Sequence, residues 1–255
     1  MIGMKAIAAC IAGMAALAGC GKAAEEAPAN STQAAALPAV APSKPAFTKS
    51  DWKRTLESAY ESSSKETDAS GITKFMACFE KKDAGKCETV AFGREDAFNK
   101  LSRFTPGYTQ LNNVADIYTN VKLHVVALEC QEPRVVIAPV YNSKNGWLFV
   151  KKFAVMADGE LVLEKDFETG DVKRDNGYGW VNEVATSIAT SGDVDALRKI
   201  SKSGALIVRI SGDKGYVTLD KARAKEFGKD AADSLIYMDK ISSALLSGGG
   251  PECRS

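Results

Sequence analysis

The stretch that decides the fold is "WLFVKKFAVMADGELVLEKDF", residues 147–167. On both sides of Asp158 and Gly159 the apolar residues follow the two-residue period of strands that bury one face. Asp-Gly between two such runs is a strong sequence signal for a β-hairpin with a two-residue turn. The stretch therefore predicts an antiparallel hairpin.

More strands are predicted on either side of this hairpin. Residues 121–129 and 134–142 are rich in β-branched side chains, and Pro139 within the second run indicates a sheet edge or a bulge, because proline cannot donate to a β-ladder. Residues 205–211 and 216–220 predict a second hairpin. The sheet is thus expected to be antiparallel and built of hairpins.

Three segments nearer the N-terminus carry apolar residues at helical spacing and are predicted as helices: 50–60, 72–79 and 93–104. In the middle segment a single apolar face is formed by Ile72, Phe75, Met76 and Phe79. We interpret these aromatic positions as core packing, the commonest role of such a stripe, in preference to a ligand groove.

The C-terminal third contains apolar residues at both the two-residue spacing of strands and the spacing of helices. Residues 178–190 are compatible with a strand or a helix, and Asp193 is expected to cap a short helix that follows. A further helix is predicted from Asp220 to Phe227 with Gly228 as its end, and residues 230–246 predict an amphipathic helix.

Helices and strands are therefore grouped along the chain and do not alternate strictly, which favours an α+β fold. We predict N-terminal helices packed on an antiparallel sheet of hairpins, with a C-terminal amphipathic helix, in one globular body over residues 48–255. A seam near residue 120, separating a small helical domain from a sheet domain, is the alternative.

The N-terminus has the features of an export signal. Lys5 precedes an apolar run from Ala6 to Ala18, which is too short for a permanent transmembrane helix, and small residues lead up to Cys20. The sequence "LAGC" at residues 17–20 resembles the type II signal peptide of bacterial lipoproteins.

This resemblance covers only the export segment. It implies that residues 1–19 are removed and that Cys20 is lipidated, and several acyl chains give the stable membrane anchoring that one chain does not. Because Gly21 stands where enterobacterial lipoproteins of the inner membrane carry Asp, the resemblance favours the outer membrane. The alternative is an ordinary secretory signal that leaves Cys20 as a spare thiol.

Residues 20–47 are rich in Ala and Pro and hold almost no large apolar side chain before Phe47. Such a segment buries too little surface to offset its ordering entropy, so we expect a flexible tether.

Cysteine usage predicts disulfides. Once Cys10 leaves with the signal and Cys20 carries lipid, an exported domain retains four cysteines, which can pair in three ways. We favour a bridge from Cys78 to Cys87, which closes the hairpin-like "CFEKKDAGKC", and then one from Cys130 to Cys253. Free thiols are the alternative, and zinc is poorly supported without paired CxxC motifs.

Charge argues against nucleic acid as a ligand. Removal of residues 1–19 takes away only Lys5 among the charged side chains, which leaves 32 basic and 32 acidic residues. Nucleic-acid-binding domains normally carry a basic excess.

No motif for catalysis or for a cofactor stands out in the sequence. The only histidine, His124, lies in a strand-like run without a nucleophile motif, and the SxxK spacings lack the companion motifs of penicillin-binding enzymes. Paired acids could hydrolyse a glycan or bind a metal. The candidate acids are interleaved with basic residues in a solvated loop and fit no ligand geometry: Glu164, Asp166, Glu168, Asp171 and Asp175.

Tyr178 and Trp180 follow a glycine in "DNGYGW" and are possible contacts to a protein or a sugar, but for Trp180 we favour inward packing at the start of an element. We therefore expect a lipid-anchored envelope protein that acts without catalysis, cofactor or metal and presents a disulfide-stapled domain to a protein partner. The alternatives are a hydrolase acting on cell wall or glycans with the acids of residues 164–175, and a module that binds a glycan or small ligand.

Overall fold

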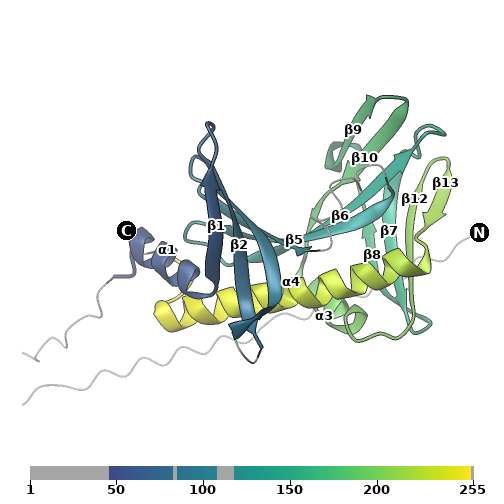
Figure 1. Ribbon diagram of the computed structural model, residues 1–255. Coiled ribbons are helices and arrows are strands. Elements are labelled where there is room, and N and C mark those ends of the chain that lie inside the picture. Colours follow the sequence, from purple (N-terminus) through teal and green to yellow (C-terminus); the bar gives the residue numbers. More distant parts are fainter. Residues whose placement is uncertain (1–45, 83–84, 108–117, 254–255) are drawn as a thin grey trace, which may run out of the picture. The chain divides into compact units, whose positions relative to one another are not determined.

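The computed structural model describes residues 46–82, 85–107 and 118–253, which belong to a single compact unit (Figure 1). Two antiparallel sheets and three α-helices make up this part of the chain. The α+β class and the antiparallel pairing are therefore as predicted, but strands contribute far more than expected. None of the helices described is long and apolar enough to cross a bilayer.

The larger sheet begins as an antiparallel meander of six strands that are consecutive in the chain, and continues into β10 and β9 with β11 paired to β6. Its strands are β1 (Glu61–Thr67), β2 (Ile72–Lys81), β3 (Cys87–Asp96), β4 (Leu101–Pro106), β5 (Asn120–Leu128), β6 (Arg134–Ser143), β9 (Val172–Gly177), β10 (Trp180–Ala185) and β11 (Ser187–Ile188).

The smaller sheet contains the predicted hairpin around Asp158 and Gly159. Its strand order is β13 (Gly215–Thr218), β12 (Leu206–Gly212), β7 (Val150–Ala157) and β8 (Glu160–Asp166). The turn between β7 and β8 consists of Asp158 and Gly159, whose φ values of 50° and 91° are the positive values that a two-residue turn requires. Both predicted hairpins are confirmed.

Each of the three helices described begins at a polar capping residue. Thr48 caps α1 (Lys49–Ser58). Thr190 caps α3 (Ser191–Ile200), and Asp193, the third helical residue, completes the capping box. The prediction that Asp193 is the cap is therefore wrong. Asp220 caps α4 (Lys221–Gly248).

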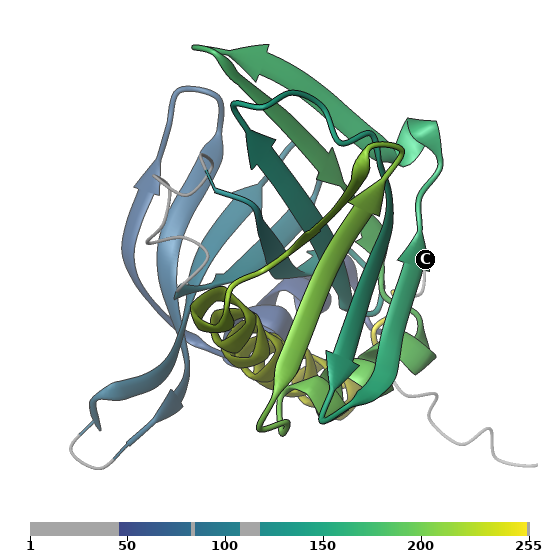
Figure 2. The ribbon, with the colours of Figure 1, turned by 90° about the vertical axis from the view of Figure 1, so that its right-hand side faces the viewer.

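Helix α4 connects the two sheets. It contacts strands of the larger sheet and β12 of the smaller one, and its ribbon runs along both sheets in Figure 1. Figure 2 shows the strands of the smaller sheet in front of this helix. The Tyr237 hydroxyl donates a hydrogen bond of 2.7 Å to the backbone oxygen of Val90, which attaches the helix to β3.

The two helices predicted on either side of Gly228 are both helical as expected, but the predicted end at Gly228 is wrong, because both segments belong to α4. Gly228 is buried within the continuous helix, and a Cβ at this position would lie 2.9 Å from the side chain of Leu206 on β12. The glycine therefore permits close packing between helix and strand and does not act as a stop signal.

The core beneath the meander is aromatic. The ring of Tyr237 lies 4.6 Å from that of Phe79, and Phe104 is fully buried 5.4 Å from Phe79. Small residues make room for these rings, since a Cβ at Gly93 would come within 2.1 Å of the Phe75 ring. The buried apolar residues of both sheets and α4 form one continuous core.

Two of the three predicted N-terminal helices are wrong. Residues 50–60 do contain α1, but 72–79 lie in β2 and 93–104 span the end of β3, a turn and β4. In β2 the buried residues are Phe75, Ala77 and Phe79, which alternate along the strand. The expectation of several N-terminal helices packed on the sheet is therefore replaced by one helix followed by strands. The ambiguous segment 178–190 is also mainly extended, as β10 and β11.

Both disulfides are present as predicted. Cys78 and Cys87 join β2 to β3 near their hairpin connection, and Cys130 pairs with Cys253 beyond the end of α4. Cys20, the proposed signal and most of the predicted tether lie outside the described residues.

Candidate functional site

The hairpin of β9 and β10 carries both aromatic residues that the sequence singled out. Gly177 pairs with Trp180 in the strand register, which leaves Tyr178 and Gly179 as a two-residue turn. Their φ values are 53° and 78°. Turns with two positive φ values favour Asn, Asp and Gly, because the side chains of other residues are strained there.

Tyr178 departs from this preference. It is a bulky residue in a left-handed conformation, and its side chain is fully exposed. Such strain has an energetic cost on the order of 1 kcal/mol, which no burial of the ring offsets here. Uncompensated strain of this kind is typical of a functional position.

Trp180 is half-buried at the start of β10. The ammonium group of Lys144 lies 4.8 Å from the centre of a Trp180 ring, within the range of a cation–π interaction. Trp180 is thus partly engaged within the domain, whereas Tyr178 is available for contact from outside.

The base of the same hairpin is anchored in the core. Glu183 of β10 is completely buried, and its carboxylate accepts hydrogen bonds from the backbone N–H groups of Leu148, Phe149 and Val150 at 2.6, 2.8 and 2.9 Å. Arg174 of β9 donates to the same carboxylate at 3.2 Å. The tip therefore extends from a fixed base.

The acids proposed for hydrolysis or metal binding do not converge on a site. Glu164 and Asp166 pair with Lys152, and the Asp171 carboxylate accepts the backbone N–H of Glu168 in a local turn. Asp175 lies exposed on β9. No group of three or more His, Cys, Asp or Glu side chains that could hold a metal ion occurs within residues 46–82, 85–107 and 118–253.

His124 lies on β5, partly buried, on the face of the larger sheet that points away from α4. Burial, followed by the charges of Arg103 and Lys122, lowers its pKa to about 3. The imidazole is therefore neutral at physiological pH and a weak base.

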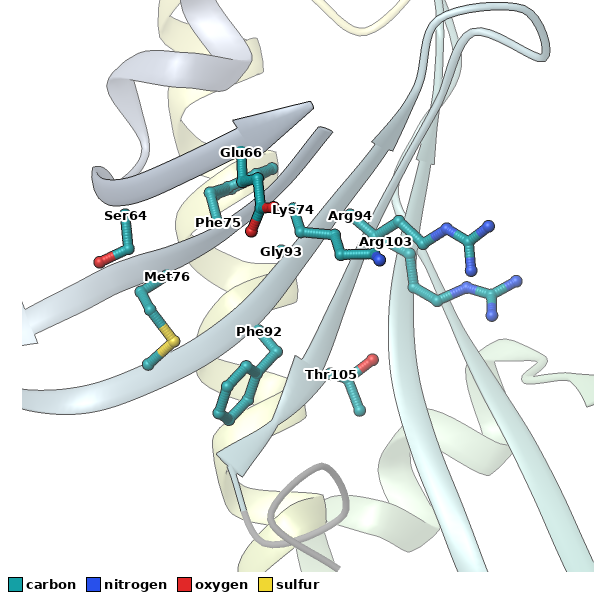
Figure 3. Close-up of a pocket in the computed structure, with 10 residues that line it drawn as sticks. All are labelled: Ser64, Glu66, Lys74, Phe75, Met76, Phe92, Gly93, Arg94, Arg103 and Thr105. Atoms are coloured by element: carbon teal, nitrogen blue, oxygen red, sulfur yellow. The ribbon is translucent and has the colours of Figure 1, made fainter. Parts of the chain in front are cut away.

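A second surface feature was not predicted from the sequence. On the outer face of β2, β3 and β4 there is a cavity of about 370 Å³, here called the basic hollow (Figure 3). It is lined by Ser64, Glu66, Lys74, Phe75, Met76, Phe92, Gly93, Arg94, Arg103 and Thr105. The helices predicted over residues 72–79 and 93–104 do not place Lys74, Arg94 and Arg103 on one face. The register of β2, β3 and β4 is what brings them together.

The chain is thus an antiparallel α+β domain with an anchored hairpin and a basic hollow on its surface. Compared with known proteins, it matches no family model, no curated protein and no solved structure. Function is therefore inferred from the residues themselves.

Proposed function

We propose that this protein is a lipid-anchored, non-catalytic component of the bacterial cell envelope, and that its domain binds a protein partner through Tyr178 at the tip of the β9–β10 hairpin. The sequence "LAGC" at residues 17–20 supports the anchor. Gly21, which stands where enterobacterial lipoproteins of the inner membrane carry Asp, favours the outer membrane. The weak basicity of His124, the only histidine, supports a role without acid–base catalysis by this residue.

The conformation and exposure of Tyr178 are the main support for placing the contact at the hairpin tip. Tyr178 is fully exposed while it occupies a backbone conformation that disfavours its side chain. Tyrosine is enriched among the residues that dominate binding energy at protein interfaces, because it brings a large ring with only two side-chain torsions to order. A partner that covers the ring would gain this contact area at low entropic cost.

The anchored base supports the same function. Glu183 holds β10 through three backbone hydrogen bonds, so the hairpin tip is presented from a fixed position. A preorganised contact loses less conformational entropy on binding than a mobile one. Among the described residues, Tyr178 combines the largest exposure of an aromatic side chain with this fixed support.

The experiment compares Tyr178→Asn with Tyr216→Asn, which removes another exposed tyrosine from β13. A photoreactive phenylalanine at position 178 first captures the partner in intact cells. The partner is then purified and immobilised, and the amount of each variant that it retains is measured. We expect Tyr178→Asn to lose most of the binding and Tyr216→Asn to retain it. Equal binding by both variants would exclude the hairpin tip as the contact.

The anchor is tested separately with Cys20→Ala. Membrane fractionation should find wild-type protein with the membranes and the variant in the soluble fraction, because the variant lacks the thiol that carries the lipid. Retention of the variant on membranes would contradict lipid anchoring, and it would leave the test of Tyr178 unaffected.

A further inference from the structure

The basic hollow brings three cations into one row across three strands. Lys74 of β2 pairs in register with Arg94 of β3, and Arg94 pairs in turn with Arg103 of β4. Directly paired residues point to the same face of a sheet. Figure 3 shows the two guanidinium groups side by side, extending in the same direction, with the Lys74 chain directed towards them.

Placing two arginines directly opposite each other is unfavourable for the sheet, because like charges in a cross-strand pair repel. The usual compensation is a nearby carboxylate. Within the described part of the chain, neither Arg94 nor Arg103 has a carboxylate within ion-pair distance, whereas Lys74 lies 3.7 Å from Asp68. Many other cations of the described residues are paired, such as Lys53 of α1 with Glu95 at 2.7 Å.

The two guanidinium groups are accessible, since Arg94 and Arg103 are both exposed. Partial burial, followed by the charge of Arg94, lowers the pKa of Arg103. A guanidinium remains charged at physiological pH even so. The free protein therefore carries two adjacent positive charges that an anion could neutralise.

An apolar row lies beside the cations. Met76 pairs in register with Phe92, and Phe92 pairs with Thr105, so these three side chains share the outer face with the basic row. Met76 and Phe92 are both partly buried, and both line the cavity. In Figure 3 the Met76 and Phe92 side chains lie on the opposite side of the hollow from the guanidinium groups.

We propose that the basic hollow binds a phosphate monoester, with the phosphate on the guanidinium groups of Arg94 and Arg103 and its apolar substituent against Met76 and Phe92. Arginine offers paired N–H donors that match phosphate oxygens. A phosphate monoester carries a charge of about −1.5 to −2 near pH 7, which matches two unpaired guanidinium groups better than the single charge of a carboxylate does.

This site is distinct from the hairpin tip, because β2, β3 and β4 are separated from β9 and β10 by β5 and β6 in the strand order. The phosphate could belong to a soluble ester or to a lipid headgroup, which present the same chemistry. Both sources are arms of the experiment.

Calorimetric titration of detergent-solubilised full-length protein tests the proposal with phenyl phosphate, inorganic phosphate and benzoate. We expect phenyl phosphate to bind most tightly, inorganic phosphate less tightly because it lacks the apolar contact, and benzoate most weakly. Phosphatidic acid in mixed micelles with the same detergent is then added as a competitor. Competition assigns the site to a lipid headgroup, and its absence assigns it to a soluble ester. Failure of both phosphates to bind would overturn the proposal.

The variants Arg94→Gln and Arg103→Gln should each weaken phenyl phosphate binding about tenfold or more, as expected for loss of a charge-assisted hydrogen bond. Arg209→Gln is the matched control, because Arg209 lies on β12 in the smaller sheet and should leave binding unchanged. Phe92→Ser should remove the preference for phenyl phosphate over inorganic phosphate. Equal weakening by Arg209→Gln would mean that the interaction is nonspecific and would overturn the site.

A stability measurement separates binding from a structural role. Without ligand, the double variant Arg94→Gln/Arg103→Gln should unfold at the same or a higher denaturant concentration than the wild type, because it removes a repulsive pair. A clearly lower midpoint would assign the arginines to maintenance of the fold and would count against the proposal.

Discussion

Phe149 donates its backbone N–H to the carboxylate of Glu183 at 2.8 Å, at the junction where the chain passes from the larger sheet to the smaller one. Phe149 has a φ of 57°, which is unfavourable for a bulky side chain. The same carboxylate also accepts the N–H groups of Leu148 and Val150. One buried side chain thus satisfies three backbone donors and stabilises a strained connection.

The first prediction is that Glu183→Ala lowers the free energy of unfolding by about 3–5 kcal/mol, because it leaves three N–H groups and Arg174 without their acceptor. Urea denaturation measures the change. Glu164→Ala, which removes a partly exposed carboxylate paired with Lys152, is the control and should cost less than about 1 kcal/mol. A similar small loss for both variants would refute the structural role of Glu183.

The second prediction concerns Gly212, which faces the same junction. A Cβ at this position would lie 2.4 Å from the backbone oxygens of Leu148 and Phe149, and backbone cannot move aside as a flexible side chain can. We expect Gly212→Ala to destabilise the protein by about 2 kcal/mol or more.

The control for Gly212 is Gly170→Ala. Its Cβ would meet no atom within 4 Å, so the thermal unfolding midpoint should stay near that of the wild type. If Gly212→Ala unfolds at the same temperature as Gly170→Ala, the junction is more adaptable than its geometry indicates.

The sequence predicted those elements whose signals are local. The hairpin at Asp158 and Gly159 needs only two strands and the turn between them, and both predicted disulfides are present. The second predicted helix failed because Ala77 is buried between Phe75 and Phe79, and a small residue hardly marks an apolar alternation. The helical spacing of the larger residues therefore dominated the pattern.

The same error concealed the basic hollow. Arg94 and Arg103 are nine positions apart, and only the register of β3 against β4 places them opposite each other. Tyr178 could be found because its neighbouring glycines indicate a turn in the sequence itself. Gly228 failed for a different reason, since its close contact with Leu206 depends on tertiary packing that the sequence around it does not encode.

The third prediction compares the two disulfides. Cys130 and Cys253 are 123 residues apart, while Cys78 and Cys87 are 9 apart. Because loop-closure entropy of the unfolded chain grows with loop length, loss of the long-range bridge should cost about 2 kcal/mol more than loss of the short one. Denaturation of the two double Cys→Ser variants measures this difference. Equal losses would show that native-state effects outweigh the loop entropy.

The fourth prediction is a pH dependence that originates from the only histidine. The folded-state pKa of His124 is about 3, below its unfolded value near 6.5, because burial and then Arg103 and Lys122 disfavour the charged imidazole. As the pH falls below 6.5, the unfolded chain takes up a proton that the folded protein does not, so the free energy of unfolding decreases until the pH reaches about 3. Between pH 7 and pH 5 the loss should be on the order of 1–2 kcal/mol.

Carboxylates with ordinary pKa values titrate mainly below this window. Burial raises the pKa of Asp233, but this group is the same in the wild type and in His124→Gln, so the difference between their profiles isolates the histidine. Denaturation at a series of pH values should give a flatter profile for His124→Gln than for the wild type between pH 5 and pH 7, whatever the absolute stability of the variant. Parallel profiles would show that His124 is protonated as readily in the folded chain as in the unfolded one. The imidazole would then be solvated on the outer face of β5, and the charges of Arg103 and Lys122 would not lower its pKa.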